Sequence, residues 1–558
     1  MKISVLTNLY CIKLPRWTAS MHFLNRKAFM IALVFTTFYF SSLVGSSSAA
    51  APASSAAAGG GRRGLAAAAG ITAGNFTQPV DHFDLQNGAS FHQRFWLQKS
   101  WWKDQSNGIV LLYINSFIWQ PDGDLTTSAV AEWAKELGAM LIEIEPRYSG
   151  QSYPVRDVTS TNIRFSTIEQ NIADYSDFIA NMTKTLQLND PRWIIVADLF
   201  NGAYATWLRA KNPQLVFGSV ATSPYMLATL EDIGYDSAYQ AWLGEACSSV
   251  VHDAVYNLSR AWSSINTTDF QHQMGCKQLL PNEEEFFYVL NSIFTSYYSS
   301  AKDLICANLT AKVNANTSDK LANFAKLLKE LRGDSSLDCI DFDIALDTNT
   351  TIPSIFSGYR PTYYLKCAQL GQFQTPKGNT SLIPPQLTLT WYLQTCKKLF
   401  SDVHIPDQPQ IDVVNALYGG ENPEGCNMIF VTSKNDLAQQ LVPDAKFVRD
   451  KSDTNRFLEI SCENPTITYS WLDTSVHENC LKDVRNQILS TLKSWKSQNS
   501  DCTKTIHKGG DSNKSVLVGF LTGTFGIIFG VLLGGAIVLF ITYHFYGKWK
   551  RSGWEKLG

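Results

Sequence analysis

The sequence has almost no net charge and no repeats. It holds 47 Lys and Arg residues against 49 Asp and Glu residues, for a net charge of -2. A protein that binds nucleic acid needs a basic surface against the phosphate backbone, so this balance argues against that class. Heptads and fixed-period repeats are missing, which argues against a coiled coil or solenoid. With 558 residues, of which 45% are hydrophobic and 17% charged, the chain can form sizeable cores in more than one domain.

Cysteine is absent between residues 12 and 246, so the first half of the chain must fold on its own hydrophobic core. No CxxC pair occurs, which weakens a zinc or thioredoxin-like interpretation. Besides Cys11 near the N-terminus, an even set of cysteines remains, which in a secreted protein predicts disulfide bonds of undetermined pairing. The set is Cys247, Cys276, Cys306, Cys339, Cys367, Cys396, Cys426, Cys462, Cys480 and Cys502.

Two long apolar segments predict the location of the chain. Residues 28–44 follow Arg26 and Lys27 and precede small residues, the pattern of a secretory signal; an uncleaved anchor helix is the alternative. Residues 516–543 are long enough to cross a bilayer, and the basic residues after them favour the cytoplasmic side. We therefore expect a single-pass type I membrane protein, at the cell surface or in an endolysosomal membrane, with its bulk outside the cytosol.

Two further patterns fit this location. Small residues recur along the membrane segment at Gly519, Gly523, Gly526, Gly530 and Gly534, which predicts close helix packing and a homodimer; plain tolerance of glycine in membrane helices is the alternative. Asparagine occurs repeatedly in the Asn-x-Ser/Thr pattern, which predicts glycosylation at several positions. These are Asn75, Asn181, Asn257, Asn266, Asn308, Asn316, Asn349, Asn379 and Asn513.

Alternating strand and helix patterns predict an α/β fold, with a parallel sheet covered by helices on both faces. Strands are expected at 109–113, 141–144, 193–196, 216–221, 428–431 and 467–471, and helices at 129–137, 168–186, 204–211 and 484–495. Between 234 and 400 helical periodicity dominates, for example at 283–294 and 320–331, and six of the ten cysteines occur there. This segment is therefore expected to be a disulfide-stapled helical cap inserted into the α/β core.

The predicted domain order follows from these segments. It comprises a signal region (1–45), an Ala/Ser/Gly leader (46–75), the first part of the core (76–233), the cap insertion (234–400), the second part of the core (401–499), a juxtamembrane linker (500–515), the transmembrane helix (516–543) and a cytoplasmic tail (544–558).

A sheet interrupted by a helical insertion suggests an α/β-hydrolase-type fold. In such enzymes the nucleophile lies on a sharp strand-to-helix turn, usually Gly-x-Ser-x-Gly, and the Asp and His of the triad follow along the chain. Here the strand at 193–196 leads into the sequence ADLFNG at 197–202, which contains no serine.

The chain contains QPVDHF at 78–83, FHQRF at 91–95, EPRYSGQSYP at 145–154 and WLRAKNP at 207–213. These motifs resemble the opening QxVDHF…FxQRY, the segment EHRYYGESxP and the WxRxKYP that follows the nucleophile in one family of serine exopeptidases. That family contains prolyl carboxypeptidase, dipeptidyl peptidase II and thymus-specific serine protease. Segments 364–375 and 387–400 resemble parts of the family's helical domain. The resemblance, which extends over about 76–495, implies an α/β-hydrolase-type core with a helical cap; we expect no cofactor and no metal.

The sequence departs from the family at the position that matters most for catalysis. When the family's GGSYGG turn is aligned back from Trp207, Gly202 takes the last glycine and Leu199 takes the serine. Leucine has no atom that can attack a carbonyl, so covalent acyl transfer is impossible there. The oxyanion region, comprising Asn115, Ser116 and Phe200, is altered too, because the family's GNEG loop becomes NSFI at 115–118. Its bulky residues would obstruct the approach of backbone to an oxyanion.

The resemblance implies that the other two triad positions are retained. FVTSKNDLA at 430–438 aligns with FVNGxLDPW, which makes Asp436 the aspartate, and SVHEN at 475–479 places His477 at the histidine of AHxxD. The order of the three positions along the chain is that of the hydrolase triad. An aspartate in a surface turn and an ordinary exposed histidine are the alternatives.

Three other acidic residues have competing interpretations. Asp198, next to the missing serine, is a candidate substitute nucleophile or base, but the altered oxyanion region argues against this role. Glu143 and Glu145 are expected to form a buried pair with Arg147 rather than an acid/base couple.

The leading hypothesis is a membrane-tethered, catalytically inactive peptidase homologue that binds a peptide, a partner protein or itself, with a peptide or protein ligand in the groove between core and cap. The alternative is an active serine exopeptidase in which Ser116 or Ser433 has replaced the nucleophile. A purely structural surface glycoprotein is the third interpretation.

Overall fold

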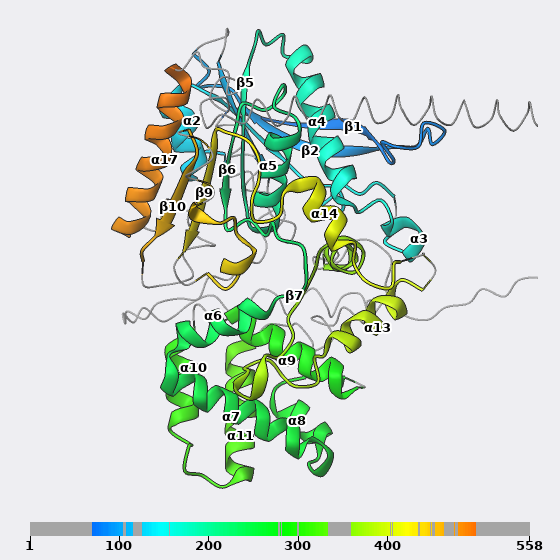
Figure 1. Cartoon of the computed structure of the whole chain (residues 1–558), viewed down its shortest axis with the longest axis vertical. Helices are drawn as coiled ribbons and strands as arrows, with labels where there is room; N and C mark the ends of the chain where they lie inside the picture. The colour runs from blue at the N-terminus through cyan, green and yellow to red at the C-terminus, as the bar shows by residue number, and fades with distance from the viewer. Residues whose placement is uncertain are drawn as a thin grey trace, which may run out of the picture. The chain divides into compact units, whose positions relative to one another are not determined.

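The computed structural model describes residues 70–103, 108–114, 125–155, 157–276, 279–280, 282–297, 301–332, 359–401, 403, 405–433, 436–446, 448, 452, 454–462, 472, 474 and 478–497. They all belong to one compact unit of the chain, Gly60–Gly558 (Figure 1). Among the described helices, none combines the length and apolar character needed to cross a membrane. The predicted signal region at 1–45 and membrane helix at 516–543 lie outside the described residues.

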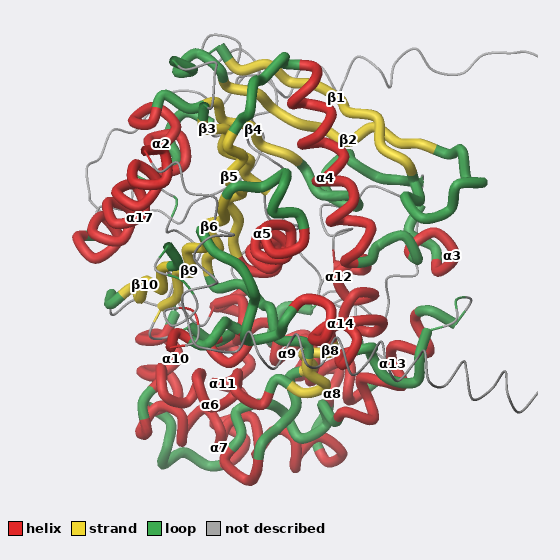
Figure 2. The backbone as a smooth tube through the Cα atoms, turned by 45° about the horizontal axis from the view of Figure 1, so that its top comes forward, coloured by secondary structure: helices red, strands yellow, loops and turns green. Residues whose placement is uncertain are grey.

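An eight-stranded sheet carries the described part of the α/β core (Figures 1 and 2). Its strands follow the spatial order β1-β2-β4-β3-β5-β6-β9-β10. All neighbours from β4 to β10 are parallel, whereas β1 pairs with β2, and β2 with β4, in antiparallel fashion. The strands are β1 (Ile71–Pro79), β2 (Ser90–Gln98), β3 (Ile109–Ile114), β4 (Met140–Ile144), β5 (Arg192–Asp198), β6 (Gly218–Thr222), β9 (Met428–Ser433) and β10 (Arg456–Ile460).

Apolar side chains leave the central strands alternately to the two faces, and each face is covered by helices (Figure 2). On β3, Leu112 and Ile114 pack with α4, α5 and α14, while Ile109 and Leu111 pack with α2 and α17. This two-sided burial is why the strands are near-continuous apolar runs. The covering helices are α2 (Ala129–Leu137), α4 (Ile168–Thr185), α5 (Leu199–Lys211), α14 (Ile411–Tyr418) and α17 (Asn479–Ser497); α3 (Ser160–Ile163) is a single turn, and η5 (Gln439–Leu441) is a 3-10 turn after β9.

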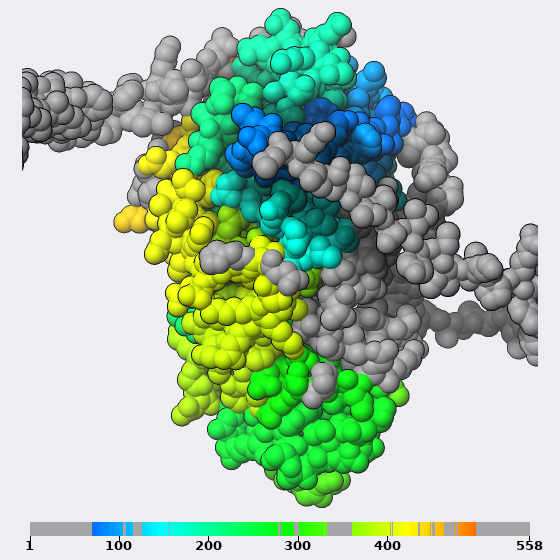
Figure 3. Space-filling model, turned by 90° about the vertical axis from the view of Figure 1, so that its right-hand side faces the viewer, coloured from blue at the N-terminus to red at the C-terminus, as the bar shows by residue number. Residues whose placement is uncertain are grey.

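The segment between β6 and β9 is mainly helical, and its buried side chains form a core rich in aromatic rings that also includes residues of the α/β part, such as Val80, Phe91 and Tyr148. Its green-coloured helices form a continuous surface in Figure 3. The elements are α6 (Ile233–Leu243), α7 (Glu245–Ala261), α8 (Thr267–Gln273), α9 (Glu283–Tyr297), α10 (Lys302–Thr310), α11 (Thr317–Arg332), α12 (Tyr359–Leu365) and α13 (Leu389–Leu399), with 3-10 turns η1 (Trp262–Ser264) and η4 (Gly378–Thr380), a π-helical turn η3 (Lys366–Leu370) and a two-stranded sheet of β7 (Thr229–Glu231) and β8 (Gly371–Phe373).

Side chains from the helical segment complete elements of the α/β core. Gln369 on η3 accepts a hydrogen bond from the backbone N–H of Ile168 (2.9 Å), and its amide nitrogen donates to Glu169 (2.8 Å). These bonds satisfy groups at the N-terminus of α4, which has orphan N–H donors like every helix start. Gly371 follows, with φ of +67° and a position where a Cβ would lie 2.2 Å from the Thr229 carbonyl oxygen, so the crossing of β7 and β8 requires glycine.

The predicted α/β class is confirmed, with three corrections. The sheet is mixed rather than parallel, because β1 and β2 add an antiparallel edge that the sequence patterns did not reveal. The leader predicted at 46–75 is too long, since β1 already begins at Ile71. Strand β10 was not predicted; its five residues, RFLEI, do not alternate strictly between polar and apolar, which makes the strand signal weak. The strand expected at 467–471 lies outside the described residues.

Disulfide bonds are present among the predicted cysteines. Three bonds join Cys247 to Cys306, Cys367 to Cys396, and Cys462 to Cys480. Cys276 and Cys426 are disulfide-bonded as well. The other two predicted cysteines, Cys339 and Cys502, lie outside the described residues.

The expected pairing of Glu145 with Arg147 is wrong. Glu145 receives two hydrogen bonds from Arg94 on β2, at 2.6 and 2.8 Å, and one from Ser152 at 2.6 Å. Side chains on adjacent strands meet more directly than residues two apart on one chain, because β2 and β4 are paired at this level. Glu143 is buried on β4, opposite Trp96 and Tyr113 of the neighbouring strands.

Arg147 instead forms a buried ion pair with Asp174 of α4, through two hydrogen bonds of 2.7 Å. The same guanidinium donates to the carbonyl oxygens of Phe165 (2.8 Å) and Val80 (3.2 Å), and the His82 ring lies 2.7 Å from Asp174. A buried charge is tolerated only when its partners satisfy it in this way. The network therefore joins the chain after β1, the chain after β4 and helix α4.

Replacing Arg147 by alanine leaves the Asp174 carboxylate buried without its main partner. We expect Arg147→Ala to lower the free energy of unfolding by about 3–5 kcal/mol. Urea unfolding followed by tryptophan fluorescence measures this loss. The matched control is Lys397→Ala, which removes an exposed ion pair with Asp407 and should cost less than about 1 kcal/mol. Similar small losses in both variants would contradict the stabilising role of the Arg147 network.

Candidate functional site

The turn from β5 into α5 has the sharp geometry of a hydrolase nucleophile turn. Strand β5 is buried up to Ala197, and α5 begins directly at Leu199 without an intervening loop. The backbone passes from an extended Asp198, with φ of -125° and ψ of 161°, to a left-handed Leu199 with φ of +49°. A non-glycine residue in this region costs roughly 1–2 kcal/mol, so the surrounding structure must impose the conformation. Leu199 therefore occupies the strained position at which such enzymes present their nucleophile.

Close packing behind the turn explains the glycine retained in it. A Cβ on Gly202 would approach the Thr222 carbonyl oxygen and the Pro224 Cβ to 3.2 Å each. Helix α5 can therefore lie tightly against the end of β6, and its residues from Asn201 to Arg209 are buried. Phe200, which follows Leu199, is half-buried and its ring meets Tyr204 edge-on. Its backbone N–H belongs to the first turn of α5, where helices have no internal acceptor.

Asp436 follows β9 and lies at the same edge of the sheet as the turn. Strands β5, β6 and β9 are consecutive and parallel, so the residues after their carboxyl ends share that edge. Asp436 is 5% exposed, and its carboxylate accepts hydrogen bonds from the Ala438 N–H (3.0 Å) and Thr432 hydroxyl (3.4 Å). Burial raises the pKa of Asp436, and the nearby hydrogen-bond donors oppose this rise. The carboxylate is thus buried and oriented by neighbours, rather than free in a surface turn.

Ser223 is a site neighbour that sequence analysis missed. It follows β6, has φ of +43°, is fully buried and lies close enough to Asp436 to lower the pKa of that carboxyl. The Ser-Pro pair directly after a buried strand is a turn signal that could have identified it. A fully buried hydroxyl is not presented to a peptide in solvent, so Ser223 is placed to support Asp436 rather than to act as a nucleophile.

Asp198 is the most perturbed acid at the turn. Its Oδ1 is inaccessible and has no hydrogen-bond partner among the described residues, and its side chain does not cap α5. Burial raises the pKa of Asp198 to about 6. Desolvation also raises the pKa of Tyr113 on the neighbouring strand, and the charges of Asp198 and Glu143 add to this rise. The sheet edge therefore holds acids that tend to stay protonated in a mildly acidic medium.

Several predicted site residues lie outside the described residues: Asn115, Ser116 and His477, with Phe117, Ile118, Lys434 and Asn435 around them. Strand β3 ends at Ile114 beside Ala197 of β5, immediately before the first of them. Leu199, Phe200 and Asp436 can thus be placed, whereas the oxyanion loop and the histidine remain sequence-based predictions.

A cluster of three potential metal ligands occurs among the described residues, at Cys462, Glu478 and Cys480. The two sulfurs form a disulfide bond with each other, so they are not available as thiolates. This cluster therefore does not fit a metal.

Comparison with known proteins agrees with the motifs on which the fold and the turn are built. The family model for serine carboxypeptidase S28 matches residues 78–437. The human thymus-specific serine protease is 23% identical over 405 residues, covering 67% of this chain and 77% of that protein. The human lysosomal Pro-X carboxypeptidase is 29% identical over 207 residues, covering 34% of this chain and 39% of that protein.

Solved structures similar to this one include an epoxide hydrolase from Vigna radiata, with 12% identity and a TM-score of 0.31 over 76% of this chain and 98% of that one. The match to the family model spans well over half of the chain and includes the turn at Leu199. The chain therefore belongs to the serine carboxypeptidase S28 family.

Proposed function

We propose that this chain is a membrane-tethered member of its family that has lost peptide hydrolysis and acts by binding peptides or proteins. The observation that carries the proposal is Leu199 at the strained turn, with φ of +49°. Acyl transfer needs a hydroxyl or thiol at this position, whose proton a base can remove, and a hydrocarbon side chain has neither lone pair nor acidic proton. The apolar run at 516–543 and the basic residues after it support the tether.

The described serines near the site do not favour a rearranged enzyme. Ser433 is the last residue of β9 and is fully buried, and Ser223 is equally inaccessible. A nucleophile must be presented to the substrate and hydrogen-bonded to its base, so neither position meets the requirement as folded. Ser116 remains the open candidate for this alternative.

Asp198 is also a poor substitute nucleophile. A carboxylate attacks only in its charged form, and burial raises the pKa of Asp198 to about 6, so the charged form is disfavoured in an acidic compartment. Its side chain lies one residue before the position that the turn presents, on the strand side.

The ligand class follows from the relatives. One of them is named a Pro-X carboxypeptidase, and loss of a nucleophile need not remove the pocket that recognises the peptide. We therefore propose that peptides with a penultimate proline bind next to Leu199. In this role the half-buried leucine fills space at the former reaction centre and makes apolar contact with the bound peptide.

The proposed loss of hydrolysis gives a prediction about catalysis. The purified full chain, treated with a fluorophosphonate serine-hydrolase probe at acidic and neutral pH, should show no covalent labelling, because no activated hydroxyl is present at the turn. Mass spectrometry of the intact protein measures the adduct, and an active serine hydrolase treated in parallel is the positive control.

Restoring a hydroxyl at position 199 tests whether the missing nucleophile alone, or also the altered oxyanion region, prevents hydrolysis. We expect Leu199→Ser to remain without measurable turnover of X-Pro-X peptides, since the GNEG glycines are absent as well. Labelling of the parent chain that disappears in His477→Ala would refute the inactive assignment. Appreciable turnover by Leu199→Ser would show that the altered loop is still competent.

The proposed ligand class gives a prediction about binding. Among short peptides tested by isothermal titration calorimetry, those with a penultimate proline should bind the full chain, and Leu199→Arg should weaken binding at least tenfold because it places a charge in an apolar contact. Leu417→Arg, an exposed position on α14, is the matched control and should bind like the parent. Equal affinities in both variants, or no binding to the parent, would exclude this site.

The raised pKa of Asp198 gives a prediction about the pH dependence of stability. The folded-state pKa of Asp198, at about 6, lies above its ordinary value, so Asp198 favours the folded state when protonated and this contribution is lost as pH rises from about 4 through 6. Asp198→Asn should therefore match the parent near pH 4 and be more stable at pH 7, by up to about 3 kcal/mol. Urea midpoints at the two pH values measure the effect. The exposed Asp190→Asn is the control, and a constant difference across the pH range would contradict the assignment.

A further inference from the structure

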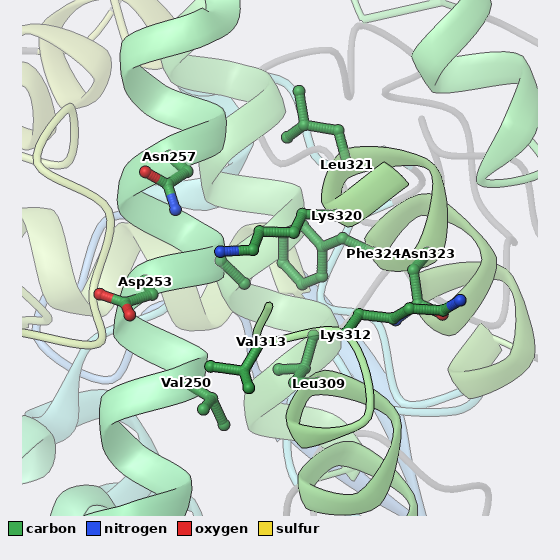
Figure 4. A pocket seen from close by; sticks show the side chains of 11 residues that line it. Val250, Asp253, Asn257, Leu309, Lys312, Val313, Lys320, Leu321, Asn323 and Phe324 are labelled. Carbon is green, nitrogen blue, oxygen red and sulfur yellow. The ribbon is translucent and has the colours of Figure 1, made fainter. Parts of the chain in front are cut away.

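A hollow of about 440 Å³, counted with its open side, lies on the helical segment and is lined by α7, the end of α10 and α11 (Figure 4). Helix α7 forms one wall, and the end of α10 and helix α11 form the other. The lining residues are Val250, Asp253, Ala254, Asn257, Leu309, Lys312, Val313, Lys320, Leu321, Asn323 and Phe324.

Helix α7 contributes one continuous stripe to this hollow. Val250, Asp253, Ala254 and Asn257 are spaced three and four residues apart, so they share one face of the helix. Asn257 is at the C-terminal end of the stripe. Side chains on a helix tilt toward its N-terminus, so the Asn257 amide is directed along the stripe toward Asp253, as Figure 4 shows.

Asn257 is also the first residue of an Asn-x-Ser sequence, Asn257-Leu258-Ser259. Its side chain is half-buried and makes no hydrogen bond with any described residue. At three other predicted glycosylation positions the amide nitrogen is engaged: Asn181 with Asp177 at 2.7 Å, Asn308 with the Leu304 carbonyl at 2.9 Å and Asn316 with Asp319 at 3.0 Å. Asn257 therefore has a free Nδ2 atom at the end of a ready-made hollow.

The chemistry of the walls suits a sugar. Val250, Ala254 and Val313 provide apolar surface, and Val313 is 43% exposed, which is costly for a side chain with nothing against it. The lining residues Leu321 and Phe324 belong to the buried core and are only 8% and 1% exposed. Asp253 and Lys320 stand at the rim with an acceptor and a donor for hydroxyl groups. A pyranose ring has both an apolar face and a rim of hydroxyls, and small-molecule sites combine apolar walls with a few polar groups in this way.

We propose that Asn257 carries an N-linked glycan and that the first sugars of this glycan occupy the hollow along α7. In the attachment step a bond forms between Asn257 Nδ2 and the anomeric carbon of a lipid-diphosphate-linked oligosaccharide. The bond from that carbon to the diphosphate oxygen breaks, the lipid diphosphate leaves with the electron pair, and the amide nitrogen loses a proton. The inference depends on the predicted secretory route and is independent of the peptide-binding proposal.

The test uses the full chain expressed in animal cells and compares Asn257 with Asn316, an exposed position at the start of α11. Site-specific glycopeptide mass spectrometry first establishes occupancy at both positions. The native protein is then digested with an endoglycosidase, and release from each position is followed over time. We expect release at Asn257 to be several-fold slower than at Asn316 in the native protein, and equal after denaturation.

A filled hollow provides the matched variant. Ala254→Phe places a ring within the stripe and should expel the sugars, so that release at Asn257 becomes as fast as at Asn316. Ala311→Phe, at an exposed position on the nearby end of α10, is the control and should leave the slow release unchanged. Asn257→Gln should also lower the melting temperature, whereas Ser318→Ala, which removes only the Asn316 glycan, should not.

Three results would overturn the proposal. The first is an unmodified Asn257 in a chain whose other positions are glycosylated. The second is equal release from Asn257 and Asn316 in the native parent protein, a comparison that does not depend on whether Ala254→Phe folds. The third is slow release that persists in a folded Ala254→Phe variant, since the protection would then arise outside the hollow.

Discussion

The buried ion pair between Arg147 and Asp174 is the interaction on which the α/β core depends. It explains why several sequence motifs are preserved together in this chain: the QPVDHF, FHQRF and EPRY segments all supply groups to one polar network. Gln78 donates to Gln93 at 2.8 Å, and Gln93 donates in turn to the Glu145 carbonyl at 2.9 Å. In a buried polar network of this kind each unpaired group is costly. These motifs are therefore structural, and their presence is compatible with an inactive site.

The turn at Leu199 combines the strained backbone of a hydrolase nucleophile turn with a hydrocarbon side chain. Strand β5 ends against β6, and helix α5 packs on Thr222 and Pro224, so the backbone is held in its left-handed conformation by its neighbours rather than by the identity of residue 199. Strain at such a position is normally associated with function. Here the same constraint acts on a residue that cannot react, which separates the requirement of the fold from that of the reaction.

Strong periodicity made much of the fold predictable from sequence. Strands β3, β4 and β5 are buried on both faces, and helix α2 was predicted with the bounds that it has, Ala129–Leu137. The antiparallel strands β1 and β2 were missed because one side of each meets solvent and their sequences mix polar and apolar residues. The ion pairs could not be predicted from the sequence. The partner of Glu145 is Arg94, which depends on strand pairing, and the partner of Arg147 is Asp174, which depends on the placement of a helix. The Ser-Pro pair marks a turn at Ser223, but its position beside Asp436 could be found only from the order of the strands.

The contacts of Gln369 have a consequence for how this protein can be taken apart. Because one amide from the helical insertion closes the first turn of a core helix, the insertion cannot be excised as a self-contained module without exposing that helix start. Chimeras that exchange caps between relatives would have to bring along a matching glutamine and the Gly371 crossing. The α/β core and the helical insertion would thus have to be exchanged together, although they occupy three successive stretches of the chain.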